Sequence, residues 1–301
     1  MQDLLDNNSL IMMEAAIVEQ LRRSGRVELD EILVNAPLIY DPRARDIMAT
    51  LYREYMDLAA QAELPFIACT PTWRAGKERV QQAGINTPIN QDAAAFLQEI
   101  RSTGSKERVR IGGQIGCKHD CYQPEAGLSA EQAEPYHAWQ LDQLAAANVD
   151  FLIAVTLPNV QEALGIARAM AATGLPYIIS FVIGRHGHIL DGTSLDAAAD
   201  LIDNSTASSP LGYMINCAHP SFLNPQSLSN NTRTRLIGFQ ANASSLDHCD
   251  LENADDLHVD SIAEWGELML EFNRSYGVKI LGGCCGTSNE HLQYLVGHRT
   301  S

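Results

Sequence analysis

The chain has 301 residues, of which 46% are hydrophobic and 19% charged, and its formal net charge is −16 at pH 7. This length and apolar content are sufficient to bury a substantial core. The acidic balance argues against a nucleic acid or an anionic membrane surface as partner, because both are bound mainly through Lys and Arg. A small-molecule substrate is therefore expected.

The first residues, MQDLLDNN, contain no basic segment, and no apolar stretch approaches the roughly 20 residues that span a bilayer. Seven cysteines, an odd number, do not form the dense framework that is typical of disulfide-rich secreted domains. We therefore expect a cytoplasmic protein whose thiols are mostly reduced and available for metal binding or nucleophilic chemistry.

Short apolar runs bounded by Gly, Pro or polar residues recur along the chain, and such runs are typical of buried parallel strands. In chain order these runs are 10–14, 65–70, 109–116, 150–156, 176–183, 212–217, 235–242 and 278–284. Apolar residues at helical spacing predict the helices 45–64, 130–147, 159–173, 194–203, 258–276 and 288–296. Eight alternations of strand and helix favour an α/β fold, a (β/α)8 TIM barrel in a single domain over residues 1–301, with a doubly wound open sheet as the alternative.

Two segments are less regular, namely 71–107 and 115–130, where proline and glycine recur. They are predicted to be long loops after the second and third strands. Long connections at the carboxyl ends of barrel strands usually shape a substrate site.

Three cysteines lie at the carboxyl ends of two predicted strands, Cys217 in the sixth and the adjacent pair Cys284 and Cys285 in the eighth. Only one strand separates the sixth from the eighth, so these thiols can converge over the barrel opening. Three thiolates suit a tetrahedral Zn²⁺ whose fourth position stays open, whereas ordinary buried cysteines are the alternative. Adjacent residues of a regular strand point to opposite faces, and the neighbouring Gly282, Gly283 and Gly286 are expected to turn both thiols inward.

An open position on Zn²⁺ can take a substrate thiol as its thiolate, which can attack an activated methyl group in line. Trp73 is a candidate binding residue for a sulfonium donor through cation–π attraction, although it could also be a loop tryptophan at the barrel edge. Asn216, directly before Cys217, could orient a ligand by hydrogen bonding. Cys117 and Cys121 could belong to a second metal cluster, but no further pair lies nearby and they are predicted to be loop residues.

The segments MINCAHPSFL around Cys217 and GGCCGTSNEHL from Gly282 resemble the two zinc motifs of the homocysteine S-methyltransferase family. The likeness extends to DFLIAVTLPNVQEA, SFVIGRHGHILDGTSL and EAAIVEQLRRSG. The resemblance implies a TIM barrel and Zn²⁺ bound by the three cysteines. It also implies methyl transfer from S-methylmethionine or S-adenosylmethionine to homocysteine, giving methionine, with Thr70 and Thr72 beside the amino acid.

Two departures from the family pattern concern the substrate. The family usually has Asp followed by glycines after the first strand, where this chain has Glu14, Ala15, Ala16 and Val18. The carboxylate expected to bind the substrate ammonium after the fourth strand is replaced by Val155. Either Glu14 supplies the missing charge, or the acceptor is a thiol without an α-amino group. A barrel that binds zinc without catalysis is the alternative from another functional class.

Overall fold

The computed structural model describes residues 1–104, 108–246 and 260–299. Its eight parallel strands form a closed barrel in chain order, so the predicted (β/α)8 fold is confirmed. Each strand overlaps one of the eight predicted apolar runs. The strands are β1 (Ile11–Met13), β2 (Phe66–Cys69), β3 (Val109–Ile115), β4 (Phe151–Leu157), β5 (Tyr177–Phe181), β6 (Gly212–Asn216), β7 (Leu236–Ala241) and β8 (Ile280–Gly283).

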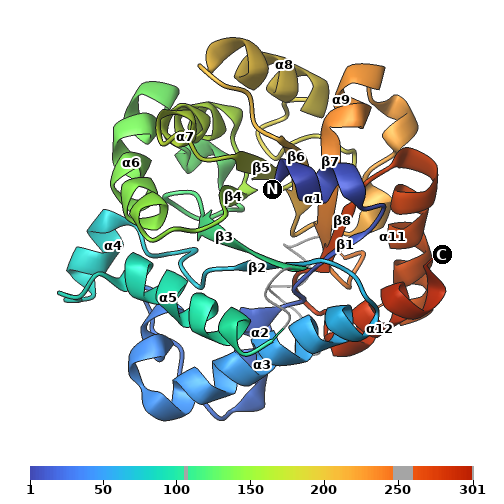
Figure 1. Ribbon diagram of the computed structural model, residues 1–301. Coiled ribbons are helices and arrows are strands. Elements are labelled where there is room, and N and C mark those ends of the chain that lie inside the picture. Colours follow the sequence, from blue (N-terminus) through green and yellow to red (C-terminus); the bar gives the residue numbers. More distant parts are fainter. Residues whose placement is uncertain (105–107, 247–259, 300–301) are drawn as a thin grey trace.

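Helices surround the barrel in an outer ring (Figure 1). Their starts follow from local sequence: Asp41 caps the third helix by accepting from the Ala44 N–H at 2.7 Å, and Ser129 forms a capping box with Gln132 at the start of the sixth. The helices after β1 are α2 (Ile17–Ser24), α3 (Pro42–Gln61), α4 (Lys77–Gln82), α5 (Ile89–Ser102), α6 (Ala130–Ala146), α7 (Val160–Ala172), α8 (Leu195–Ser205), α9 (Asn230–Arg235), α11 (Ile262–Tyr276) and α12 (Asn289–His298).

The predicted loop over 71–107 is wrong, because this segment contains the two helices α4 and α5. In α5 the side chains of Ile89, Ala93, Phe96 and Ile100 are buried at helical spacing, and their burial outweighs the turn signal of Pro88, which caps the helix start. The predicted loop over 115–130 is irregular between β3 and α6 apart from the short 3-10 helix Pro124–Ala126.

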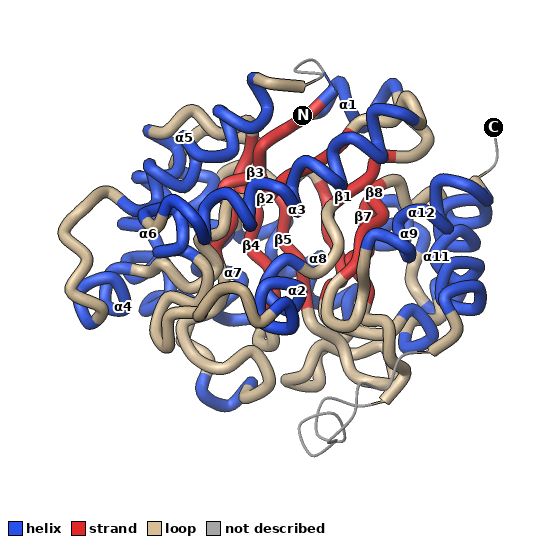
Figure 2. Tube along the Cα trace, turned by 90° about the horizontal axis from the view of Figure 1, so that it is seen from below, coloured by secondary structure: helices blue, strands red, loops and turns tan. Residues whose placement is uncertain are grey.

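The interior of the barrel is filled at the amino ends of the strands. Phe151, Ile153 and Ile280, near the starts of their strands, belong to one apolar cluster with Leu4 and Leu5 of α1 (Gln2–Asn7). Figure 2 shows α1 at one end of the barrel and most of the long loops at the other. We call the first end the floor and the second, at the carboxyl ends of the strands, the mouth.

Among the described residues, no helix combines the length and the apolar character that crossing a membrane requires.

Candidate functional site

The three predicted ligand cysteines meet at the mouth. The Sγ atoms of Cys217 and Cys284 are 2.6 Å apart, and those of Cys217, Cys284 and Cys285 all lie within 4.8 Å of one another. Zinc–sulfur bonds of about 2.3 Å give a tetrahedron with sulfur–sulfur edges of about 3.8 Å, so the three sulfurs are close enough to share one ion, although the Cys217–Cys284 pair is closer than this edge. Within 1–104, 108–246 and 260–299, it is the only group of three or more His, Cys, Asp or Glu residues placed to hold an ion.

The adjacent cysteines converge because they lie beyond the end of β8, in the turn that follows it. Of the three glycines expected to turn the thiols inward, only Gly286 has a left-handed backbone, with φ 81°. The other two allow close packing instead: a Cβ on Gly282 would lie 2.9 Å from the Cβ of Met13, and one on Gly283 would lie 2.2 Å from the Oγ1 of Thr287.

Cys217 is held by the ends of three strands. Its own φ is 52°, and Thr156 at the end of β4 has a φ of 56°, an unusual backbone for residues with a side chain. The Asn216 Nδ2 donates to the Cys217 Sγ at 3.3 Å, while its Oδ1 accepts from the Thr156 N–H at 3.0 Å and the Ser180 hydroxyl at 2.7 Å. Asn216 thus orients a cysteine, although its contact with a substrate stays a prediction.

The predicted site lacked the two polar residues at the end of β7. The Asn242 Oδ1 accepts from the Cys285 N–H at 3.1 Å, and both Gln240 and Asn242 line the same cavity as the cysteines. The sequence does contain a signal for these residues. They are polar and come at the end of a buried apolar run, and the carboxyl ends of such runs lie at the mouth of a barrel.

The thiols of the cysteine cluster differ in the direction of their pKa shifts. Hydrogen bonds from the Cys217 and Cys284 thiols hold the pKa of Cys285 well below its usual value, and the nearby charge of Arg22 acts in the same direction. The pKa of Cys217 is raised well above its usual value because of its hydrogen bonds with the other two thiols and its burial. Of these two thiols, Cys285 is therefore the one that loses its proton more readily.

A cavity of about 540 Å³ opens over the cysteine cluster. Its lining comes from loops and strand ends all around the mouth. Of the predicted substrate-binding residues it includes Glu14, Thr70, Trp73 and Asn216, together with the three cysteines.

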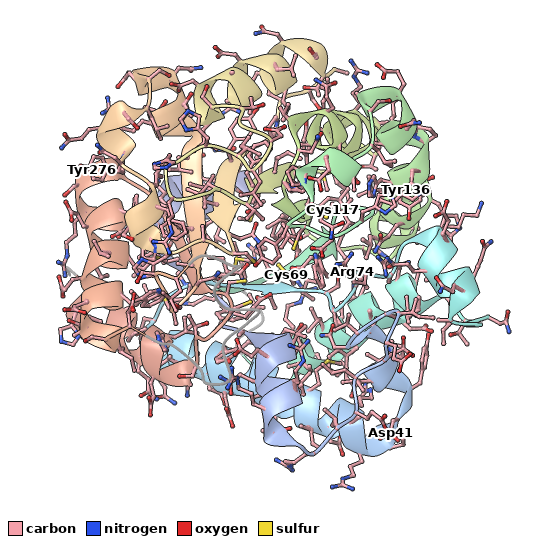
Figure 3. All side chains as sticks on the ribbon, turned by 180° about the vertical axis from the view of Figure 1, so that it is seen from behind. Asp41, Cys69, Arg74, Cys117, Tyr136 and Tyr276 are labelled. Atoms are coloured by element: carbon pink, nitrogen blue, oxygen red, sulfur yellow. The ribbon has the colours of Figure 1, made fainter. Side chains whose placement is uncertain are left out.

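Glu14 lies in the cavity wall with its carboxyl group buried. The Cys69 N–H donates to both carboxyl oxygens, at 3.1 Å to Oε1 and 3.2 Å to Oε2. Burial outweighs these hydrogen bonds and raises the pKa of Glu14 to about 8, so the group is mostly protonated at neutral pH. Figure 3, seen from the side opposite Figure 1, shows Cys69 near the centre of the barrel.

The two predicted threonines differ in position. Thr70 lines the cavity, but Thr72 is fully buried and is not among the described residues lining it. The Thr72 hydroxyl lies 2.6 Å from that of Thr70 and donates to the Gln114 carbonyl at 2.6 Å. Thr72 therefore supports Thr70, and the geometry adds no support for its direct contact with a substrate.

Trp73 lines the cavity with its ring already in contact with a cation. The Arg74 guanidinium lies 4.2 Å from the ring centroid, and the indole Nε1–H donates to the Thr156 hydroxyl at 2.7 Å. This stacking leaves less aromatic surface for a sulfonium, so the binding of donor by Trp73 stays a prediction.

The loop after β3 forms no second metal cluster within the described chain. Cys117 and Cys121 are buried, and the Cys117 thiol donates to the His119 carbonyl at 3.4 Å. Arg74 donates to the same carbonyl at 2.7 Å. In Figure 3 Arg74 and Cys117 lie beside each other near Cys69. Tyr122 of this loop lines the cavity, a residue that the sequence did not single out.

Comparisons with known proteins agree with this architecture. The family described as "Homocysteine S-methyltransferase" matches residues 11–297. The chain is 24% identical to homocysteine S-methyltransferase YbgG of Bacillus subtilis, covering 98% of this chain and 96% of that protein. It is 21% identical to betaine–homocysteine S-methyltransferase 1 of Bos taurus, covering 97% of this chain and 72% of that protein.

The solved structures of the homocysteine methyltransferase MmuM from Escherichia coli share the fold. The metallated form superposes with a TM-score of 0.75 at 18% identity, and the oxidized form with 0.76 at 18%; each comparison covers 98% of both chains. The family match spans the barrel from its first strand into its last helix, including all three clustered cysteines. This chain therefore belongs to the homocysteine S-methyltransferase family and is a methyltransferase enzyme.

Proposed function

We propose that this enzyme uses Zn²⁺ to transfer a methyl group from S-methylmethionine or S-adenosylmethionine to the thiol of homocysteine, giving methionine, in the cytoplasm. The observation that carries the proposal is the convergence of three sulfurs, from the ends of two strands, on the wall of a 540 Å³ cavity. A cavity of this size accommodates small molecules.

The donor set fits zinc better than other common divalent ions. Thiolates are soft ligands that select zinc over magnesium, calcium and manganese, and three protein ligands leave one position open. When bound, Zn²⁺ would supply that position and a positive charge that favours the thiolate form of an acceptor thiol.

The chain's own residues would fix the reaction geometry. Asn216 holds the Cys217 sulfur through its Nδ2, and Asn242 fixes the backbone of Cys285 through its Oδ1. Methyl transfer needs the acceptor sulfur, the methyl carbon and the leaving sulfur in line, so rigid placement is the main contribution that the protein can make.

A related zinc methyltransferase with a different thiol acceptor or methyl donor is the second candidate, because Val155 in the cavity wall is 4% exposed and carries no charge for an ammonium. The third is a zinc-binding barrel without catalysis.

Two measurements on the purified protein test the proposal. Metal analysis is expected to find about one zinc per chain. Incubation with methyl-labelled S-methylmethionine or S-adenosylmethionine and homocysteine is expected to yield labelled methionine. Full zinc without transfer to any of several thiols would favour the non-catalytic barrel, and a chain that binds no zinc would end the proposal.

A further inference from the structure

We infer that the cavity selects its methyl acceptor by a carboxylate, which Arg22 binds, and makes little use of an α-amino group. This inference rests on the proposed function and names the class of acceptor, a thiol carboxylic acid. It follows from the charges that line the cavity, which are those of Glu14, Glu19, Arg22 and Arg23 among the described residues.

Two of these charges neutralise each other. Arg23 forms an ion pair with Glu19 at 2.6 Å. Glu19 also accepts a hydrogen bond from the backbone N–H of Gly286, next to the cysteine cluster. Each Glu19 oxygen therefore already accepts one hydrogen bond, and an incoming ammonium would have to compete with Arg23 and Gly286 for this carboxylate.

No other carboxylate of the described lining offers a full negative charge at neutral pH. Glu14 is buried and its raised pKa of about 8 leaves it mostly protonated, while both of its oxygens already accept from the Cys69 N–H. Val155 provides only an apolar surface. The ionised carboxylate that remains on this wall is Glu19, which already pairs with Arg23, so the loss of hydration of a substrate ammonium would be poorly compensated.

Arg22 is the cation that remains. It is exposed in the last turn of α2 and lines the cavity, and within 1–104, 108–246 and 260–299 no carboxylate pairs with its side chain. Glu19, three residues earlier in α2, accepts from the N–H of Gly286, so this helix lies against the turn that carries Cys284 and Cys285. A guanidinium binds a carboxylate through two parallel hydrogen bonds, a geometry that an ammonium ligand cannot use.

The start of α2 adds to this positive character. Ala15, Ala16 and Ile17 line the cavity, and no side chain caps the helix at Ala16. The Ala16 N–H already donates to the Thr287 hydroxyl at 3.2 Å and Glu19 lies in the first turn, so the remaining N–H groups and the helix dipole add only a small contribution to the charge of Arg22. Figure 2 shows α2 on the side of the barrel that carries the long loops.

Three thiols of similar length distinguish the contributions that the carboxylate and the amino group of homocysteine make to binding. Homocysteine carries both, 4-mercaptobutanoate lacks the amino group, and 3-mercaptopropylamine lacks the carboxylate. Isothermal titration calorimetry of the zinc-loaded protein, without a methyl donor, gives the dissociation constant of each. Transfer from S-methylmethionine or S-adenosylmethionine then gives kcat/KM for each.

We expect 4-mercaptobutanoate to bind within about threefold of homocysteine, and 3-mercaptopropylamine to bind at least about tenfold more weakly. Arg22→Gln is expected to weaken both carboxylate thiols by about tenfold or more and to change 3-mercaptopropylamine less than twofold. Arg26→Gln, which removes the same charge from an exposed residue outside the cavity lining, is the matched control and should leave all three constants unchanged.

The outcomes separate this inference from the proposed function. Selective binding of the carboxylate thiols without methyl transfer would sustain the role of Arg22 and overturn the proposed activity. A loss of tenfold or more on removing the amino group would overturn the inference even in an active enzyme. So would an equal effect of Arg22→Gln on all three thiols, because Arg22 would then act through Cys285 and not through the substrate.

Discussion

The floor and the mouth of this barrel are built from the same strands but from different chemistry. At the floor, Phe151 and Ile153 pack with Leu4 and Leu5 of the N-terminal helix in a cluster without charges. At the mouth, the same strands end in cysteines, amides and a buried carboxyl group. Apolar burial stabilises the folded state at the floor, whereas the mouth contains polar groups whose burial costs free energy. Stability and function are therefore located at opposite ends, and substitutions should affect them separately.

The largest expected effect is at the cysteine cluster. Cys284→Ser should lower the zinc content from about one per chain to below about 0.1, because two remaining sulfurs form an incomplete site. Methyl transfer should fall with it, while the circular dichroism spectrum stays that of the folded barrel. Cys117→Ser, a buried cysteine outside the cluster, is the control and should keep its zinc. Retention of zinc by Cys284→Ser would contradict the assignment of that ligand.

The reverse result is expected at the floor. Phe151→Ala removes a ring that is 0% exposed and should lower the free energy of unfolding by about 3–5 kcal/mol, measured by urea titration. The folded fraction should still bind about one zinc per chain. Loss of zinc from the folded protein would mean that the two ends are coupled through the barrel.

The buried carboxyl group of Glu14 is expected to make the stability of the protein depend on pH. Its pKa is about 8 in the folded chain against the usual 4.5, so between these values the folded state holds a proton that the unfolded state has released. Stability contributed by the protonated group is therefore lost as pH rises from about 4.5 to 8. Glu14→Gln should remove this dependence, raising stability at pH 8 relative to pH 5 by about 3 kcal/mol compared with the wild type. Parallel unfolding curves of the two proteins across this range would refute the raised pKa.

The smallest effect concerns the amide that holds Cys217. Asn216→Ala removes the Nδ2 donor to the sulfur and should weaken zinc binding by about 10–100-fold in a competition with a chelator. Ser180→Ala is the matched control, because Ser180 contacts the same amide but not the sulfur. Equal losses in the two variants would show that the packing of Asn216, and not its hydrogen bond to sulfur, matters.

The convergence of the cysteines could be predicted because it depends on topology. Residues that follow β6 and β8 must reach the same end of a parallel barrel, whatever their side chains. The helix α5 is harder to predict, because Pro88 and Gly104 at its two sides are turn signals that mask the helical spacing between them. Its apolar residues indicate a helix once this spacing is counted.

The individual roles of side chains were harder to predict. Thr70 and Thr72 are two residues apart, yet only Thr70 reaches the cavity, because the loop after β2 turns between them. Arg22 resembles any exposed arginine near the end of an amphipathic helix, and its place on the cavity that also contains Cys285 depends on contacts across more than 260 positions of sequence. Such contacts leave no local signal in a single chain.

The left-handed backbone of Thr156 and Cys217 has a consequence for engineering. A residue with a side chain in this conformation lowers the stability of the fold by roughly 1 kcal/mol, and Gly or Asn would largely avoid this cost. Selection for thermal tolerance alone would therefore tend to replace them. At Thr156 such a change would release the indole of Trp73, and at Cys217 it would delete a ligand of the cluster. A more heat-resistant descendant of this protein could thus arise at the expense of its chemistry.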